Sequence, residues 1–285
     1  MNTKTKNRAI FIYLLIVLGT CYMAGVLEAV TGTGKVYKFL GICFTFIPVM
    51  AAVVTKRITG EKAKYHLSLR VWKNMKYWML SALLPGVLIA AGAAIYYLFF
   101  PDQYSGIFEI GMRLGMDAQV CVKHPVFIAI VCILISALMF PIQLLELGEE
   151  IGWRGYLLGF QVQKYSKRKA AIINGVEWGL AHLPLVYFGF NYSLENRGAP
   201  WSNMGMMMLI CIVLGIILSY VTVRTGNCMY AAIIHGVVNV IGELPVYLSR
   251  TLVSGLLGPN PTGMLAMLPL LIMAILCLLK CEVKK

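Results

Sequence analysis

Residues 204–223 read MGMMMLICIVLGIILSYVTV, an unbroken stretch of apolar and small polar residues without a single charge. A helix that crosses the hydrocarbon core of a bilayer needs about 20 such residues, so this stretch predicts a membrane-spanning helix. The composition of the chain agrees, because 59% of its 285 residues are hydrophobic and only 13% are charged. Average soluble domains carry about 25% charged residues. We therefore expect a polytopic membrane protein.

Outward from residues 204–223, other apolar stretches are long enough to span a membrane, which makes about eight in all. In chain order the predicted spans are Ala9–Val30, Phe39–Thr55, Trp78–Phe100, Val126–Leu145, Ala171–Phe190, Met204–Val223, Cys228–Leu248 and Met264–Leu279. The fold class that follows is all-α, with about eight transmembrane helices in one bundle. We expect residues 1–285 to form a single transmembrane domain.

The distribution of charge predicts how the bundle is oriented. The net charge of +13 does not indicate nucleic-acid binding, since the position of the charges matters more than their sum in a membrane protein. Most lysines and arginines fall near the two termini, in residues 56–76 and in residues 164–169. By the positive-inside rule, both termini are expected on the cytoplasmic side. The short loops are typical of a bacterial protein, so we expect a multi-pass protein of a bacterial plasma membrane.

The first polar cluster, Glu149-Glu150-Ile-Gly-Trp-Arg154, lies at the predicted cytoplasmic end of the fourth span. Charged residues at membrane depth cost roughly 2.5–3.5 kcal/mol, so they often mark functional sites. Glu150 and Arg154 are four residues apart and can pair on a helix, which would leave Glu149 facing the bundle interior. A carboxylate in an apolar pocket suits general-base chemistry. A solvated helix end is an equally open interpretation of this cluster.

Two further clusters have the same spacing inside predicted spans. Trp178-Gly-Leu-Ala-His182 places two rings on one helix face, so we expect the indole to stack over the imidazole. His235-Gly-Val-Val-Asn239 likewise places an imidazole and an amide together. The alternatives are a histidine bonded to a backbone carbonyl of a neighbouring helix and polar contacts that join helices.

Together the clusters supply the groups that a peptide-bond hydrolase requires. Hydrolysis needs a base that activates water and donors that hold the oxyanion of the tetrahedral intermediate. A glutamate, two histidines and an asparagine meet both needs. The spacing alone does not distinguish hydrolysis from proton-coupled transport.

The ordered set, Glu149-Glu150-x-x-x-Arg154, then an aromatic residue-x-x-x-His182, then His235-x-x-x-Asn239, resembles the CPBP family. This family comprises CAAX-processing and bacteriocin-processing proteases and is also called the ABI family. Type II CAAX prenyl endopeptidases are its eukaryotic members. The resemblance covers roughly residues 126–247, the predicted catalytic core. The family pattern usually has Phe in place of Trp178, so the larger indole is expected to narrow the cleft.

The resemblance implies an eight-helix bundle with a catalytic cavity open toward the cytosol. It implies that Glu149 and His182 activate the attacking water, while His235 and Asn239 hold the oxyanion. Glu150 and Arg154, with Trp178, would support the site. The expected partners are a peptide or membrane-protein substrate and the lipid bilayer, with no nucleic acid.

Metal dependence has two interpretations. Glu149, His182 and His235 together are an acceptable zinc set. The His-Glu-x-x-His signature of zinc proteases is absent, however, and asparagine is a poor zinc ligand. We expect a glutamate-dependent mechanism without a cofactor, with a zinc-dependent metalloprotease as the alternative.

Two other functions stay open at this point. The same residues would serve a multi-pass transporter as a proton or ion relay, although the chain shows no repeated half. A membrane immunity protein would bind a peptide without cutting it. The sequence favours an intramembrane endopeptidase over both.

Overall fold

A computed structural model describes residues 3–105, 124–138, 144–250 and 255–281. Over these residues the chain is all-α, as predicted, with isolated bridges and no strand. The α-helices are α1 (Thr3–Thr31), α2 (Lys35–Cys43), α3 (Ile47–Thr59), α4 (Met75–Phe99), α7 (Pro125–Leu138), α9 (Leu147–Glu150), α10 (Leu158–Lys164), α11 (Lys167–Tyr187), α12 (Trp201–Thr225), α13 (Met229–Ile241) and α14 (Leu268–Lys280). A π-helix, η5 (Ile151–Leu157), joins α9 to α10. The 3₁₀ turns are η1 (Phe44–Phe46), η2 (Val71–Asn74), η3 (Pro101–Gln103), η4 (Leu144–Glu146) and η6 (Leu244–Leu248).

Several helices meet the length and composition of a membrane span. Within the described ranges there are five such segments, Thr3–Thr31, Lys35–Thr59, Val71–Phe99, Trp201–Thr225 and Met229–Leu248. Each of them coincides with a predicted span, which supports a polytopic membrane protein.

The other three predicted spans coincide with α7, α11 and α14, of which α14 is a shorter apolar helix. Residues 139–143 of the predicted span Val126–Leu145 lie outside the described residues. The total of about eight spans therefore stays a prediction.

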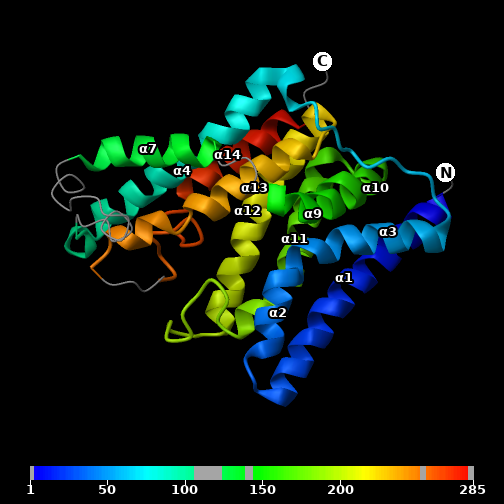
Figure 1. The fold of residues 1–285 in the computed structure, drawn as a ribbon, viewed down its shortest axis with the longest axis horizontal. Helices are drawn as coiled ribbons and strands as arrows, with labels where there is room; N and C mark the ends of the chain where they lie inside the picture. The colour runs from blue at the N-terminus through cyan, green and yellow to red at the C-terminus, as the bar shows by residue number, and fades with distance from the viewer. Residues whose placement is uncertain (1–2, 106–123, 139–143, 251–254, 282–285) are drawn as a thin grey trace.

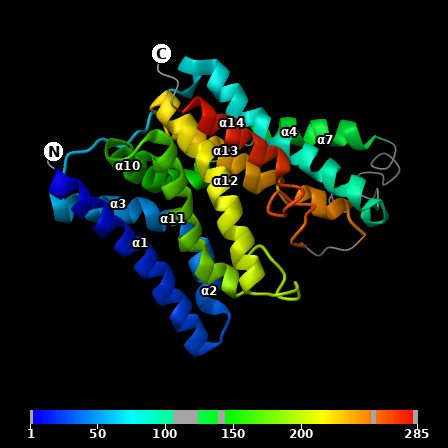
Figure 2. The same ribbon diagram turned by 180° about the vertical axis from the view of Figure 1, so that it is seen from behind.

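The helices are arranged around a central pair. In both views α11 and α12 run side by side through the middle of the molecule, with α1, α2 and α3 on one flank (Figures 1 and 2). Helices α4, α7 and α14 lie on the other flank, and α13 lies against α12 and α4. Segments that are distant in sequence, such as α9 and α13, therefore meet near the centre.

The central pair packs closely because glycines face each other across it. A Cβ atom on Gly215 of α12 would lie 2.8 Å from the Cα atom of Gly175 in α11. The same Cβ would lie 3.3 Å from Nη2 of Arg154, so the missing side chain also leaves room for the guanidinium. Small residues at such crossings let transmembrane helices approach each other's backbones.

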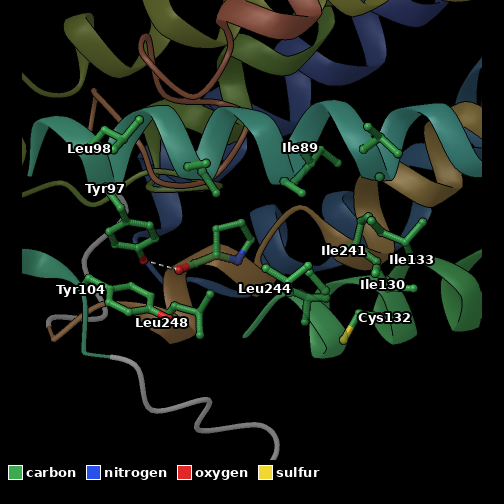
Figure 3. Close-up of a pocket in the computed structure, with 18 of the residues that line it drawn as sticks. Ile89, Tyr97, Leu98, Tyr104, Ile130, Cys132, Ile133, Ile241, Leu244 and Leu248 are labelled. Carbon is green, nitrogen blue, oxygen red and sulfur yellow. Dashed lines mark hydrogen bonds between the residues drawn. The ribbon is translucent and has the colours of Figure 1, made fainter. Parts of the chain in front are cut away.

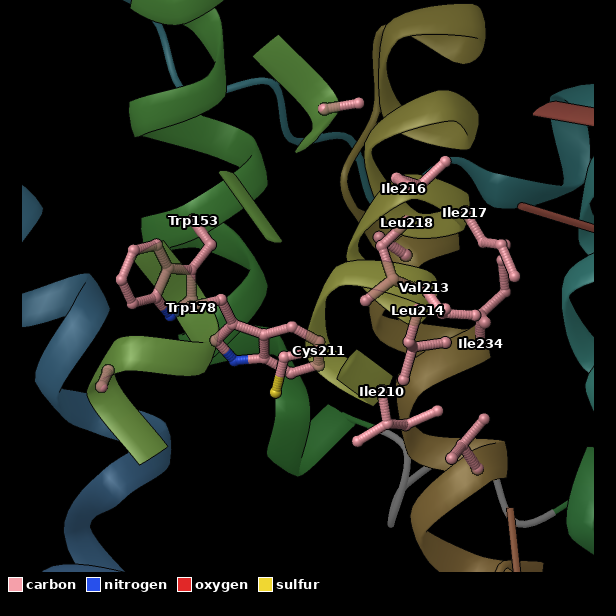
Figure 4. Packing of buried hydrophobic residues seen from close by; sticks show 14 of the residues in the cluster. Trp153, Trp178, Ile210, Cys211, Val213, Leu214, Ile216, Ile217, Leu218 and Ile234 are labelled. Atoms are coloured by element: carbon pink, nitrogen blue, oxygen red, sulfur yellow. The ribbon is translucent and has the colours of Figure 1, made fainter. Parts of the chain in front are cut away.

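Large apolar side chains fill the space around this crossing. Trp153 of η5 is fully buried, and Trp178 of α11 is 3% exposed. They belong to one buried cluster with Ile210 and Leu214 of α12 and Ile234 of α13 (Figure 4). The functional residues are thus set into a packed interior.

We expect Gly215→Ala to destabilise the protein, because the added methyl group would meet the backbone of α11. Overpacking of this kind typically costs about 1–3 kcal/mol. Gly205→Ala is the matched control in the same helix, since a Cβ there has no atom within 4 Å and alanine favours helix. Thermal melting of both variants in one detergent checks this, and equal melting temperatures would contradict the close crossing.

Candidate active site

The candidate site is built from three helical segments that carry the predicted motifs. The chain from η4 through α9 into η5 supplies the acidic cluster and Arg154, α11 supplies Trp178 and His182, and α13 supplies His235 and Asn239. In η5 the chain is a π-helix, a rare form that is frequent at functional sites. The sequence analysis did not predict it.

A polar cavity of about 290 Å³ lies where these segments meet. The four residues predicted to be catalytic all line it: Glu149, His182, His235 and Asn239. Glu146, Trp178 and Glu243 line it as well. Residues more than 80 positions apart in the chain therefore face one small space, as the motifs predicted.

Glu150 and Arg154 form the predicted ion pair. The Arg154 Nη1 atom lies 2.9 Å from Glu150 Oε1, and both side chains are completely buried. The same carboxylate oxygen lies 3.0 Å from Nδ1 of His235 in α13. Glu150 thus joins η5 to α13, a contact that the spacing of the motif did not show. These contacts argue against a solvated helix end.

Trp178 touches four of the charged or titratable residues. Its indole Nε1 donates a hydrogen bond to Glu149 Oε1. The guanidinium carbon of Arg154 lies 4.3 Å from the centre of the indole. The rings of His182 and His235 meet the indole at centroid distances of 5.3 and 5.2 Å, with interplanar angles of 84° and 81°.

The predicted stacking of the indole over the His182 imidazole is wrong. The two rings are nearly perpendicular, because the guanidinium of Arg154 takes the face of the indole as a cation–π partner. The imidazole therefore meets the indole edge to face. This arrangement is the one that aromatic pairs favour electrostatically.

His182 is oriented by its own helix. Its Nδ1 lies 2.9 Å from the carbonyl oxygen of Trp178, one turn earlier, and not from a carbonyl of a neighbouring helix. A carbonyl only accepts, so Nδ1 carries a hydrogen, and in the neutral ring the lone pair is then on Nε2. The ring also packs against Phe44 of η1 at a centroid distance of 4.5 Å. His182 is thus held in one orientation in the lining of the cavity.

Glu146 is a site residue that the sequence analysis missed. Its Oε1 accepts a hydrogen bond of 3.0 Å from Nδ2 of Asn239, and its Oε2 lies 3.8 Å from Nε2 of His235. The signal was present in the sequence, since Glu146 precedes Glu149 by three residues and so shares its helix face.

The structure alters the set of residues that a metal ion would use. Among the described residues, Glu146, Glu149 and His235 place one possible ligand atom each within 4.8 Å of one another. His182, which was in the predicted zinc set, is not in this group. Two carboxylates and an imidazole are chemically acceptable to zinc. Glu146 would therefore take the place of His182 in a metal-dependent mechanism.

A larger apolar cavity lies on the other side of α13. It has a volume of about 740 Å³ and is lined by α4, α7, the end of α13 and η6, including Ile89, Ile133, Ile241 and Leu244 (Figure 3). At one end Tyr97 donates a hydrogen bond of 2.6 Å to the carbonyl of Pro245. Pockets of roughly 300–1,000 Å³ are the usual size for bound small molecules or substrate groups.

Comparison with known proteins agrees with this geometry. Residues 125–241, which contain all three motifs, match the family model described as Type II CAAX prenyl endopeptidase Rce1-like. CAAX prenyl protease 2 of Methanococcus maripaludis is 32% identical over 108 residues, which are 37% of this chain and 40% of that protein. The chain thus matches less than half of that relative's length. The predicted resemblance to a CAAX-protease-like family is confirmed over the segment that carries the motifs.

We expect Glu150→Gln to destabilise the fold. Gln keeps the shape but leaves the buried Arg154 without a counter-charge, and removing one partner of a buried pair costs about 3–5 kcal/mol. Glu149→Gln is the control, because Glu149 does not pair with Arg154 and Gln retains the oxygen that accepts from Trp178. Melting temperatures and yields of both variants check this. A lower melting temperature for Glu149→Gln than for Glu150→Gln would reverse the assignment.

Proposed function

We propose that the protein is an intramembrane endopeptidase that hydrolyses a peptide bond with a water molecule activated by Glu149. The observation that carries this proposal is that Glu149, His182, His235 and Asn239 line one polar cavity within a membrane protein. The family match over residues 125–241 supports a protease.

Glu149 is the proposed base because of how it is held. Its Oε1 accepts from the Trp178 indole, which leaves Oε2 to take a proton from water. His182 Nε2, with a free lone pair, is the second acceptor for that water. As the peptide bond breaks, the proton passes from Glu149 to the leaving amine, so the carboxylate is regenerated.

His235 and Asn239 are the proposed oxyanion donors. The Nδ2 atom of Asn239 lies 3.0 Å and the Nε2 atom of His235 lies 3.8 Å from carboxylate oxygens of Glu146. Because Nδ1 of His235 also faces a carboxylate oxygen, that of Glu150, the ring donates from Nε2 only as an imidazolium with a hydrogen on both nitrogens. The carboxyl group of Glu146 therefore lies beside both groups that are proposed to hold the oxyanion, with one oxygen facing each. In the reaction the carbonyl oxygen of the substrate would replace Glu146 at these donors. The hydrogen bonds to this oxygen would become stronger as its negative charge develops.

The substrate is proposed to be a peptide or the tail of a membrane protein. The relative from Methanococcus maripaludis is named as a prenyl protease. The apolar cavity beside α13 has the size and lining for a hydrophobic group attached to such a substrate. We propose a bacterial plasma membrane as the location, with both termini in the cytoplasm, on the basis of the distribution of lysine and arginine.

We expect Glu149→Gln to lower peptide turnover by about 10²–10⁴-fold, since the amide cannot take a proton from water. Asn239→Ala is expected to lose about 10²–10³-fold, as for one lost oxyanion donor, with little change in substrate binding. The measurement is turnover of one quenched fluorescent peptide, found by screening a library that includes peptides with a prenylated C-terminal cysteine.

Gln163→Ala is a suitable control, because this exposed side chain donates a hydrogen bond to the Gly159 carbonyl of its own helix and does not line the cavity. If Glu149→Gln turns over the peptide normally while Glu150→Gln is folded and inactive, Glu150 is the base. If neither substitution affects cleavage, this cavity is not the protease site.

We also propose that activity does not depend on a metal ion. The two oxygens of Glu146 already face nitrogen atoms of Asn239 and His235, so the carboxyl group has partners from the protein itself. Purified protein treated with a chelator is therefore expected to keep its turnover. Stoichiometric zinc in the protein, with activity lost on its removal and regained on its return, would instead establish the metal-dependent alternative.

A further inference from the structure

A third cavity lies away from the candidate active site, between α4, α12, α13 and α14. It has a volume of about 340 Å³, and none of its lining residues lines the polar cavity of the site. We call it the α4–α14 groove. It uses neither the residues nor the chemistry of the proposed protease site, so its role is a separate question.

One end of the groove is positively charged. Lys76, in the first turn of α4, and Lys280, the last residue of α14, both line it and both are exposed. The two helix ends lie close together at one end of the bundle (Figure 1). Among the described residues that line the groove there is no aspartate or glutamate. Two cations therefore share this end without an acidic residue in the lining.

Beyond the lysines the groove becomes amphipathic. The phenol groups of Tyr77 and Tyr220 line it, and so does Ser81. Ser81 is 1% exposed, and its hydroxyl has no hydrogen-bond partner among the described residues. A buried hydroxyl without a hydrogen-bond partner costs free energy. A polar group bound in the groove would remove this cost.

The rest of the groove is apolar and opens sideways. Leu84, Leu88 and Met273 line it, together with Leu80 and Leu276, which are each 43% exposed. In a membrane protein such exposed leucines face lipid chains. The groove thus offers, in order, positive charge, a small polar zone and an apolar wall that meets the bilayer.

We propose that the α4–α14 groove binds an anionic phospholipid. The phosphate would lie between Lys76 and Lys280, an ester carbonyl would accept a hydrogen bond from Ser81, and an acyl chain would lie along the leucines. Basic pockets between transmembrane helices bind anionic headgroups in this way. A zwitterionic headgroup fits less well, because its own cation would face the two lysines.

Binding would be expected to stabilise the bundle that carries the active site. Ile217 and Tyr220 of α12 and Ile234 of α13 line the groove, while Leu214 of α12 and His235 of α13 line the polar cavity. Anything that binds only the folded protein raises its stability.

The test uses the full chain in detergent, with phosphatidylglycerol or phosphatidylcholine added. We expect phosphatidylglycerol to raise the melting temperature and to bind on the order of tenfold tighter than phosphatidylcholine. The difference in affinity is the one expected from the attraction of two lysines for a net negative headgroup. Lys76→Ser/Lys280→Ser should abolish this preference. The matched control Lys4→Ser/Lys6→Ser removes the same charge from α1 and should retain it.

Two further arms separate a lipid from a free phosphate. Glycerol phosphate, which lacks chains, should not stabilise the protein. Ser81→Phe fills the groove but keeps both lysines, so it should weaken binding of phosphatidylglycerol; Leu276→Trp replaces this variant if it does not fold. Any one of four results would overturn the proposal. These are equal binding of the two lipids, an unchanged preference in the double lysine variant, full binding by the filled variant, and stabilisation by glycerol phosphate.

Discussion

The arrangement of the helices around the site depends on the buried ion pair between Glu150 and Arg154. Both side chains are completely inaccessible in a chain that is otherwise strongly apolar. The desolvation of two charges is recovered only with good geometry and additional partners. The partners here are His235, which shares the Glu150 oxygen, and the indole of Trp178, which covers the guanidinium. Bringing these partners to the pair therefore requires α9, η5, α11 and α13 to meet at one point.

Trp178 connects this ion pair to the residues proposed to be catalytic. One ring binds the guanidinium on its face, donates its N–H to Glu149 and presents edge-to-face contacts to both histidines. By its size alone, the indole is expected to narrow the cleft in comparison with phenylalanine. The structure gives the larger ring a different role, since phenylalanine has no N–H to hold Glu149 in place. The substitution relative to the usual family pattern is thus chemical as well as steric.

The sequence predicted the general fold and the main groups of the site, because the first follows from the length of apolar stretches and the second from the spacing of polar residues. Long apolar stretches predicted the helices, and spacing of four residues predicted the Glu150–Arg154 pair. Spacing shows which residues share a face, but it does not show what that face meets. The orientation of Trp178 depends on Arg154 from another segment, and the place of Glu146 depends on Asn239 of α13. Neither partnership has a signature in the local sequence.

No pattern in the sequence predicts the π-helix. Its presence limits how many residues this segment can gain or lose. In Ile151–Leu157 each hydrogen-bonded turn holds one residue more than an α-helical turn does. Because a π-helical turn accommodates one extra residue, deleting a single residue here would return the chain to ordinary α-helix, and the helix beyond it would stay near its present register. A deletion between Glu150 and Arg154 would change their spacing from four residues to three and so move the guanidinium relative to the carboxylate and the indole. A one-residue gap in an alignment of related chains at this segment therefore marks a rebuilt centre, while a longer gap in a loop does not.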